Sequence, residues 1–447
     1  MTLYFDEFFL HDTYKYDKML GRIKICKERC STTTILHGNI VHTPSFGQLT
    51  VIPGGYLVLE DGVISGIYET LPDTCSACAV EDWGDRLIMQ SFADLHLHAP
   101  QYPMLGLGMD LPLLDWLNTY TFRNEERFSD LEFARRTYRK LARDLITSGT
   151  TRVAMFSSRH ADATLILMKE LERAGVTGYV GKVNMDRNSG VAQETTEDSL
   201  RETLRWLDGC RFEHIKPILT PRFTPSCSGE LMAELGRIAK ERDLPVQSHL
   251  SENLAEIDWV RELHPDCQQY WDTYDKYGLW KRGTLMAHCV HSDEREQRAM
   301  IDAGVTAVHC AASNVNICSG TAAVRQMIER GVNVALGSDI AGGDELAMHK
   351  VVVTSIRASK IRAMEHGDPF LTVPEGYYLG TSAGHRYFGA QGGFAVGDRL
   401  HAIVVDDSDF PEGARPLTLP ERFERAVYLM GKESIRAVYS EGRKVVG

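Results

Sequence analysis

The sequence predicts an α/β protein with two parts, a (β/α)8 TIM-like barrel and a small β-sandwich domain built from both chain ends. Between residues 86 and 391, short apolar runs alternate eight times with longer helical patterns. Eight consecutive βα units close most economically into a barrel, whose reactive side chains lie at the carboxyl ends of the strands. On both sides of this region, apolar and polar residues alternate between Gly and Asp turns, which is typical of an antiparallel β domain.

These patterns divide the chain into three segments. Residues 1–31 form an N-terminal extension to which no role is assigned, and residues 86–391 form the barrel. Residues 32–85 and 392–447 together form the small β domain, with strands expected within 32–44, 55–70, 397–407 and 434–447.

The eight barrel units follow one another along the chain. Strands are predicted within 86–98, 150–158, 177–186, 215–223, 245–252, 283–290, 305–313 and 333–340. Helices are predicted within 131–149, 161–175, 196–209, 228–243, 253–264, 292–304, 320–331 and 344–367. Gly175, Gly304 and Gly331 come directly after helical patterns, where a glycine in the left-handed conformation often ends a helix.

The composition excludes several classes of protein. With 61 acidic and 49 basic residues the net charge is −12, which argues against a nucleic-acid surface. The one basic cluster, residues 134–143, lies on a helical pattern and is interpreted as a solvated helix face. The sequence has no run of 18 apolar residues and no signal-peptide pattern at its start, so we expect a soluble, cytoplasmic protein without membrane partners.

The ten cysteines do not follow a disulfide framework. Cys75 and Cys78 form a lone C-x-x-C, and Cys26 and Cys30 a looser pair, so a structural zinc site was one alternative. No helix or hairpin pattern supports that site, and reduced thiols are the favoured interpretation.

Polar side chains capable of binding a metal come at the ends of several predicted barrel strands. His96 and His98 are two residues apart and therefore share one face of the first strand. His249, His288, His309 and Asp339 follow at the ends of later strands, with Glu252 just beyond His249 and Arg222 at the end of the fourth strand. Each histidine alone is more often a hydrogen-bonded core residue, but their repetition at independent strand ends favours a site for Zn²⁺ or another borderline divalent ion.

The motifs at these strand ends identify a resemblance to the amidohydrolase superfamily and, within it, to the guanine deaminases. The resemblance extends over nearly the whole chain after Thr32. Its most specific parts are HLHAPQY (residues 96–102), MDLPLLDWLNTYTFRNEERF (109–128), TPRF (220–223), QSHLSEN (247–253), MAHCV (286–290), HCAASNVNICSG (309–320) and GSDIAGG (337–343).

The resemblance implies a role for each of these side chains in the hydrolytic deamination of guanine to xanthine and ammonia. One Zn²⁺ per chain would be bound by His96, His98, His249 and Asp339. Glu252, His288 and Asp339 would be catalytic, and Gln101, Arg222, Phe223 and Glu252 would contact the purine. Relatives of this kind are dimers, so a homodimer is expected.

The chemistry of deamination explains why these residue types are needed. Zn²⁺ lowers the pKa of bound water from ~15.7 to ~7, which supplies hydroxide for attack at C2 of the purine. Glu252 is expected to carry the proton of that water to N3 and, with Asp339, to return a proton to the departing amino group. Arg222 only donates hydrogen bonds, which suits the O6 carbonyl of guanine and disfavours an amino group there.

Alternatives remain at several of these positions. Arg222 could instead form a salt bridge at the barrel rim, and Phe223 could be a core residue. The loop after the first strand, with Asp110, Asp115 and Trp116, is expected to cover the pocket or simply to pack against it.

Some positions depart from the family pattern without being expected to touch the metal. They are Gln90–Ser91 before the first strand end, Ala311–Ala312, Ala383 and His401. The nearest alternative function is a related aminohydrolase acting on a pterin, an adenosine-like purine or a triazine. A non-enzymatic metal-binding relative is disfavoured because Glu252 and Arg222 are both present.

Overall fold

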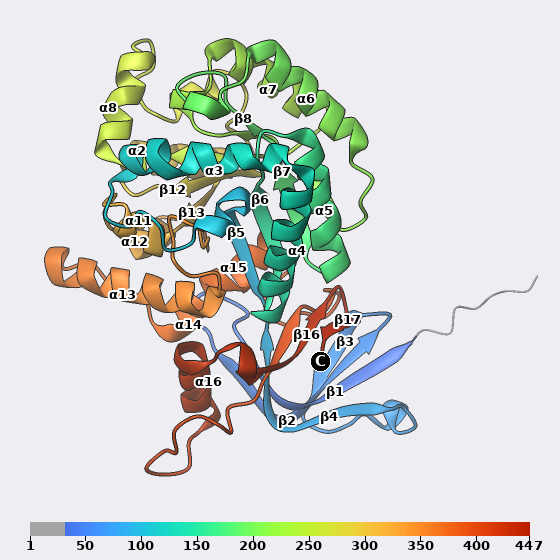
Figure 1. Cartoon of the computed structure of the whole chain (residues 1–447). Coiled ribbons are helices and arrows are strands. Elements are labelled where there is room, and N and C mark those ends of the chain that lie inside the picture. Colours follow the sequence, from blue (N-terminus) through green and yellow to red (C-terminus); the bar gives the residue numbers. More distant parts are fainter. Residues whose placement is uncertain (1–31) are drawn as a thin grey trace, which may run out of the picture.

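The computed structural model describes residues 32–447, so the predicted extension 1–31, with Cys26 and Cys30, lies outside the described residues. Two four-stranded parallel sheets form the centre of the larger part of the molecule (Figure 1). The first contains β5 (Phe92–His98), β6 (Thr150–Phe156), β7 (Thr177–Gly181) and β9 (Ile215–Pro217). The second contains β11 (Val246–Leu250), β12 (Thr284–His288), β13 (Thr306–His309) and β14 (Asn333–Leu336).

Backbone contacts join the two sheets at both of their edges. At one edge Leu219 forms a parallel bridge with Val246, and at the other the Asp339 N–H donates to the His96 carbonyl over 2.8 Å. The strand of Leu219 is interrupted because Pro217 and Pro221 lack the N–H groups that a regular ladder needs. All eight strands therefore run in one direction, and their carboxyl ends meet on one side of the molecule.

Helices cover these strands on the outside. The eight that follow the strands are α4 (Leu131–Thr147), α5 (Ala161–Ala174), α6 (Thr196–Gly209), α7 (Gly229–Glu241), α8 (Leu254–Leu263), α10 (Glu294–Ala303), α12 (Val324–Glu329) and α13 (Met348–His366). Gly175 and Gly304 end α5 and α10 in the left-handed conformation, as the sequence predicted. On α4, Tyr138 and Leu141 are fully buried while Arg139 and Lys140 are 64% and 67% exposed, which confirms the solvated basic face.

Shorter elements complete the chain. The other described helices are α2 (Leu113–Trp116), α3 (Phe122–Glu126), α9 (Asp272–Asp275), α11 (Ala311–Asn316), α14 (Val373–Gly380), α15 (Ser382–Tyr387) and α16 (Leu419–Leu429). The π-helical turn is η3 (Leu117–Thr121), and the 3-10 turns are η1 (Asp73–Cys75), η2 (Ala99–Met104), η4 (Arg127–Ser129), η5 (Gly190–Ala192), η6 (Thr224–Ser226) and η7 (Lys432–Ser434). The two-residue strands β8 (Val183–Asn184) and β10 (Thr220–Pro221) pair with each other.

The small β region is one seven-stranded sheet with the order β17-β16-β15-β4-β1-β2-β3. Its strands are β1 (Thr33–His42), β2 (Thr50–Glu60), β3 (Val63–Tyr68), β4 (Val80–Gln90), β15 (Ala402–Val405), β16 (Ile435–Ser440) and β17 (Arg443–Val446). Strands from both chain ends lie in this one sheet, and the predicted β-sandwich is not shown. Because β4 pairs with both β1 and β15, the strands of both ends join in a single hydrogen-bonded sheet.

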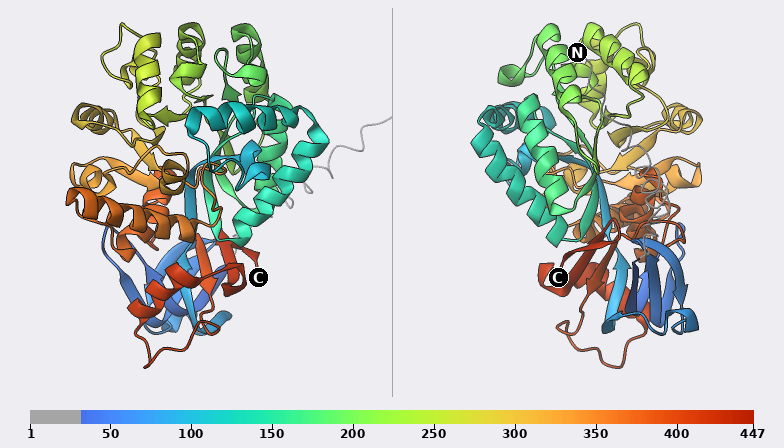
Figure 2. Two further views of the ribbon diagram at one scale, coloured as in Figure 1. Left: turned by 60° about the vertical axis from the view of Figure 1, so that its left-hand side comes forward. Right: turned by 90° about the vertical axis from the view of Figure 1, so that its right-hand side faces the viewer.

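This sheet lies below the helix-covered strands (Figure 2). The chain passes directly from β4 of this sheet to β5, the first of those strands. Leu87–Gln90, expected at the start of the first barrel strand, pair with β15, so the barrel strand itself begins at Phe92. Gln90 links the two parts, since its side chain bonds the Thr43 N–H and the Ser382 hydroxyl. Within residues 32–447, no helix combines the length and apolar character needed to span a bilayer.

Candidate active site

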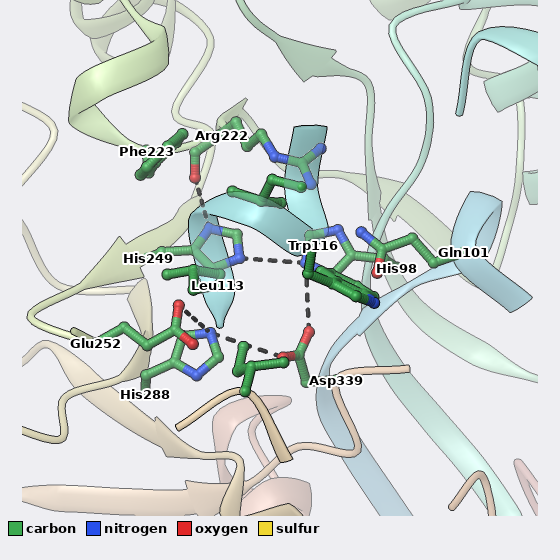
Figure 3. Close-up of a pocket in the computed structure, with 12 residues that line it drawn as sticks. His98, Gln101, Leu113, Trp116, Arg222, Phe223, His249, Glu252, His288 and Asp339 are labelled. Atoms are coloured by element: carbon green, nitrogen blue, oxygen red, sulfur yellow. Dashed lines mark hydrogen bonds and ion pairs between the residues drawn. The ribbon is translucent and has the colours of Figure 1, made fainter. Parts of the chain in front are cut away.

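Four of the predicted metal ligands meet at the carboxyl ends of the strands. His96 and His98 come from β5, His249 from β11, and Asp339 from the turn after β14. The Asp339 Oδ1 atom lies 3.2 Å from His96 Nε2 and 3.4 Å from His98 Nε2, and the latter lies 3.2 Å from His249 Nε2. All four side chains are buried, and His98, His249 and Asp339 point toward one another (Figure 3).

The donor atoms of this cluster fit a divalent cation. The nitrogens of His98 and His249 that face each other cannot both be satisfied without a proton or an ion between them, and His96 Nε2 has no hydrogen-bond partner among the described residues. Burial holds the pKa of His98 and His249 well below the usual range, so both rings are neutral. Burial opposes ionisation of Asp339, yet His96 and His288 keep its pKa below the usual range and the carboxylate charged. Neutral imidazoles with one carboxylate form a donor set that suits zinc and similar ions.

A second layer of contacts fixes the orientation of the cluster. The buried Asp94 carboxylate accepts hydrogen bonds from the Ser338 N–H at 2.9 Å and the Ser338 hydroxyl at 2.5 Å, which ties β5 to the turn of Asp339. His249 Nδ1 lies 2.6 Å from the Arg222 carbonyl, so this nitrogen carries the proton and Nε2 is left for the cluster. Gly337 lets the turn approach, because a Cβ there would lie 2.7 Å from the His96 Cβ.

Glu252 and His288 lie beside the cluster. His288 Nε2 is 3.5 Å from Glu252 Oε2 and 3.8 Å from Asp339 Oδ2, and its Nδ1 is 2.8 Å from the Asn314 amide oxygen. Burial raises the pKa of Glu252 to about 7, although the neighbouring His288 partly counteracts this rise. A carboxyl group with such a pKa can both accept and release a proton near neutral pH. We call His249, Glu252, His288 and Asp339 the catalytic wall.

The opposite side of the pocket contains the residues predicted to contact the purine. Arg222 follows β10, Phe223 is the next residue, and Gln101 lies in η2 after β5. Arg222 does form a salt bridge, because its Nη1 atom lies 2.7 and 2.9 Å from the two oxygens of Glu125. The pair is buried inside the pocket wall rather than at the rim, and Gln101 Nε2 donates to the same carboxylate over 2.9 Å. We call Gln101, Glu125, Arg222 and Phe223 the recognition wall.

Glu125 was missed in the sequence, although it lies within the block 109–128 that carries part of the resemblance. Its position in a run of polar residues, RNEER, resembles that of a surface helix. A buried Arg222 needs a carboxylate partner, and this need was the only indication of such a residue. It does not identify which Asp or Glu is the partner.

The segment after β5 covers the pocket. Leu113, Trp116 and Leu117 line it from α2 and η3, and Ile317 lines it from the loop after α11. Trp116 therefore reaches the pocket as predicted, whereas Asp110 and Asp115 are exposed to solvent.

Other singled-out residues lie outside this pocket. His309 is buried at the end of β13, and burial lowers its pKa to about 4, but it does not join the metal-type cluster. Cys75 and Cys78 lie half-buried in and after η1 as free thiols. His401 bonds the Thr151 hydroxyl over 2.9 Å and Glu441 over 3.0 Å, so this departure from the family pattern links β6 to the seven-stranded sheet.

The fold and the cluster of strand-end histidines define a class of protein that the sequence comparison also identifies. The chain matches the Amidohydrolase family over residues 87–445. The chain therefore belongs to the amidohydrolase family, which has a TIM-barrel type of fold and depends on bound metal.

Within that family the chain is similar to guanine deaminases, as the motifs predicted. It is 34% identical over 442 residues to guanine deaminase of Dictyostelium discoideum, which covers 92% of this chain and 98% of that protein. It is 37% identical over 377 residues to guanine deaminase of Mus musculus, covering 81% and 83% of the two chains. The crystal structure of guanine deaminase from C. acetobutylicum with bound guanine in the active site superimposes with a TM-score of 0.89 at 42% identity, covering 92% of this chain and 99% of that one.

Proposed function

We propose that the protein is a guanine aminohydrolase, a hydrolase of C–N bonds that converts guanine and water to xanthine and ammonia. The observation that carries this proposal is one pocket with a catalytic wall on one side and a recognition wall on the other. The relatives named above support the choice of guanine, because the similarity extends over most of both chains.

The proposal includes one Zn²⁺ per chain, held by His96, His98, His249 and Asp339. When bound, such an ion lowers the pKa of a coordinated water to about 7 and so supplies a nucleophile at neutral pH. The buried, neutral imidazoles and the charged Asp339 are the residues of this chain that would hold it.

Glu252 is the proposed proton carrier. Its pKa of about 7 allows the carboxylate to take a proton from the attacking water and to deliver it to N3 of the purine, which makes C2 more electrophilic. A second proton, passed by Glu252 or Asp339, would allow the amino group to leave C2 as ammonia. His288, 3.5 Å from Glu252, would hydrogen-bond the water or the departing group.

The recognition wall would hold the other edge of the purine. The Arg222 guanidinium offers donors only, which fits the O6 carbonyl of guanine and leaves an amino group at that position unpaired. Phe223 lines the pocket next to His249, with ring centroids 6.4 Å apart, and would contact a flat heterocycle.

A substrate panel tests this function. The purified protein, with its metal content measured, is given guanine, adenine, adenosine, a pterin and an aminotriazine, and ammonia release is followed with xanthine quantified by chromatography. We expect xanthine and ammonia in equal amounts from guanine and far slower release from the other rings. No ammonia from guanine, with release from another ring, would instead identify a related aminohydrolase.

The proposal also covers the organisation of the protein. We propose a single closed barrel over residues 86–391 with a small domain of residues 32–85 and 392–447, in a homodimer located in the cytoplasm. Light scattering of the purified protein measures the mass, and a value near 50.1 kDa, that of one chain, would exclude the dimer.

A further inference from the structure

Glu125 is the buried carboxylate of the recognition wall. Its side chain is 3% exposed, and it does not itself line the pocket, although Gln101 and Arg222 do. Its Oε1 atom accepts hydrogen bonds from Gln101 Nε2 at 2.9 Å and Arg222 Nη1 at 2.9 Å, and its Oε2 atom lies 2.7 Å from Arg222 Nη1. One carboxylate therefore holds both of the polar side chains that face the pocket from this side.

These bonds leave part of the Arg222 side chain free. Glu125 engages only the Nη1 atom of Arg222, and the Nε and Nη2 groups donate no hydrogen bond to any residue in the range 32–447. The guanidinium carbon lies 5.4 Å from the centroid of the Phe122 ring, which limits its movement on that side. The amide oxygen of Gln101 accepts the Ala341 N–H over 3.2 Å, so the side chain is held at both of its polar atoms.

Neighbouring contacts keep Glu125 in place on α3. The Asn124 side chain donates to the Pro100 carbonyl over 2.7 Å, which ties the helix to the turn that carries Gln101. On the other side, Glu126 pairs with Arg159 over 2.8 Å. The carboxylate thus reaches the wall from a short helix that is anchored before and after it.

We propose that Glu125 is a positioning residue that determines specificity for a neutral carbonyl oxygen, the O6 atom of guanine. It neutralises Arg222 and directs the remaining guanidinium donors, so that the wall favours an uncharged acceptor. A buried guanidinium without its carboxylate would keep a full charge and lose its orientation. This inference deepens the proposed function and rests on it.

The test compares guanine with 2-aminopurine, which lacks the O6 atom, in wild type and in Glu125→Gln. The substitution keeps the size of the side chain and removes its charge. We expect KM for guanine to rise about 10- to 100-fold, because a misplaced contact group typically has an effect of this order, with a smaller change in kcat. Since 2-aminopurine has no oxygen to misalign, its inhibition constant should change much less, and the preference for guanine should fall by nearly the factor by which its KM rises.

Glu170→Gln is the matched control, since Glu170 is also a buried glutamate, 5% exposed, and it pairs with Arg139 and Arg173 outside the pocket. Its constants for both ligands should equal those of wild type. If Glu125→Gln changed the constants for guanine and 2-aminopurine by the same factor, or changed the guanine KM by less than twofold, the positioning role would be overturned.

Two further outcomes are separated by design. If Glu125→Gln does not fold, Glu125→Asp replaces it in the test. Aspartate retains the charge but is too short to reach both Gln101 and Arg222, so the preference for guanine should still fall. An unchanged preference would contradict the proposal. If the wild-type protein releases no ammonia from guanine, the proposed function fails instead, and the two failures are distinguishable because the second concerns wild type alone.

Discussion

The two walls of the pocket balance their charges in different ways. On the recognition wall, Arg222 and Glu125 neutralise each other within 2.7 Å, and the pair needs no ligand to be stable. On the catalytic wall, Asp339 and Glu252 are surrounded by imidazoles, and the described residues place no Lys or Arg in ion-pair contact with either carboxylate.

We expect this difference to separate substrate binding from the chemical step. A neutral, preassembled wall can orient an uncharged ring without a change in its own charge state. A wall of imidazoles and carboxylates that face one another is suited to a cation and to proton transfer, since its groups gain most from a positive ion between them. A substitution on the catalytic wall should therefore mainly lower kcat. A substitution on the recognition wall should mainly raise KM.

A second buried ion pair provides a reference for Arg222–Glu125. Lys182 is fully buried, and its Nζ atom lies 3.0 and 3.1 Å from the two oxygens of Glu194 and 3.1 Å from the Val183 carbonyl. Ser199 also donates to Glu194 over 2.9 Å. This pair uses its donors internally and lies away from the pocket, so it resembles Arg222–Glu125 in chemistry but has no free group for a ligand.

The largest effect is expected from removing a metal ligand on the catalytic wall. His249→Ala should lose bound metal and reduce guanine deamination to the uncatalysed rate, as measured by metal analysis and ammonia release. The matched control is His264→Ala, because His264 forms the other described cluster of this kind, with Asp266 and Cys267. If the His264 variant lost the metal instead, the metal site would be assigned to the cluster of His264, Asp266 and Cys267.

The next effect in size concerns proton transfer. Glu252→Gln should lower kcat about 10²- to 10⁴-fold while the metal content stays near one equivalent per chain and KM changes little. Glu296→Gln is its control, since burial also raises the pKa of Glu296 to about 7, but this residue does not line the active-site pocket. A normal kcat in Glu252→Gln would exclude the proton-carrier role.

A smaller effect, confined mainly to KM, is expected on the recognition wall. Arg222→Ala removes a charged hydrogen-bond donor to the purine, and such bonds contribute about 1.5–3 kcal/mol, so KM for guanine should rise roughly 10- to 150-fold. Steady-state kinetics measure this, with thermal unfolding to detect destabilisation by the unpaired Glu125. An unchanged KM would show that Arg222 does not contact the substrate.

The smallest effect on activity is expected at the reference pair. Lys182→Met leaves a buried Glu194 charge unpaired, which should lower the free energy of unfolding by about 3–5 kcal/mol. KM for guanine should equal that of wild type at a temperature where the variant is folded, because Lys182 lies outside the pocket. A raised KM without a loss of stability would contradict this assignment; denaturant unfolding and kinetics together decide it.

Much of the site could be predicted because it depends on short-range patterns. The period of two along a strand places His96 and His98 on one face, and the ends of apolar runs mark where His249, His288 and Asp339 emerge. The structure brings these residues together in two groups that share His96, and Gln101, Arg222 and Phe223 line the pocket beside them. Their catalytic and binding roles stay predictions.

The arrangement of the small domain could not be predicted in the same way. Alternating residues indicate strands but do not reveal which strands pair, and β4 bonds β1 on one side and β15, more than 300 residues later, on the other. This long-range pairing joins strands of both chain ends in one sheet, and it places Leu87–Gln90 in that sheet rather than in the barrel strand.

The sequence by itself determined the order of the main strands and helices and the metal-binding types of residue at the strand ends. These follow from local periodicity and from the direction that parallel strands share. Only the tertiary structure decided that Glu125, from a polar run on a short helix, would be buried against Arg222 and Gln101. The physical reason is that a buried guanidinium requires a carboxylate, but which carboxylate comes within 2.7 Å depends on how the whole chain packs.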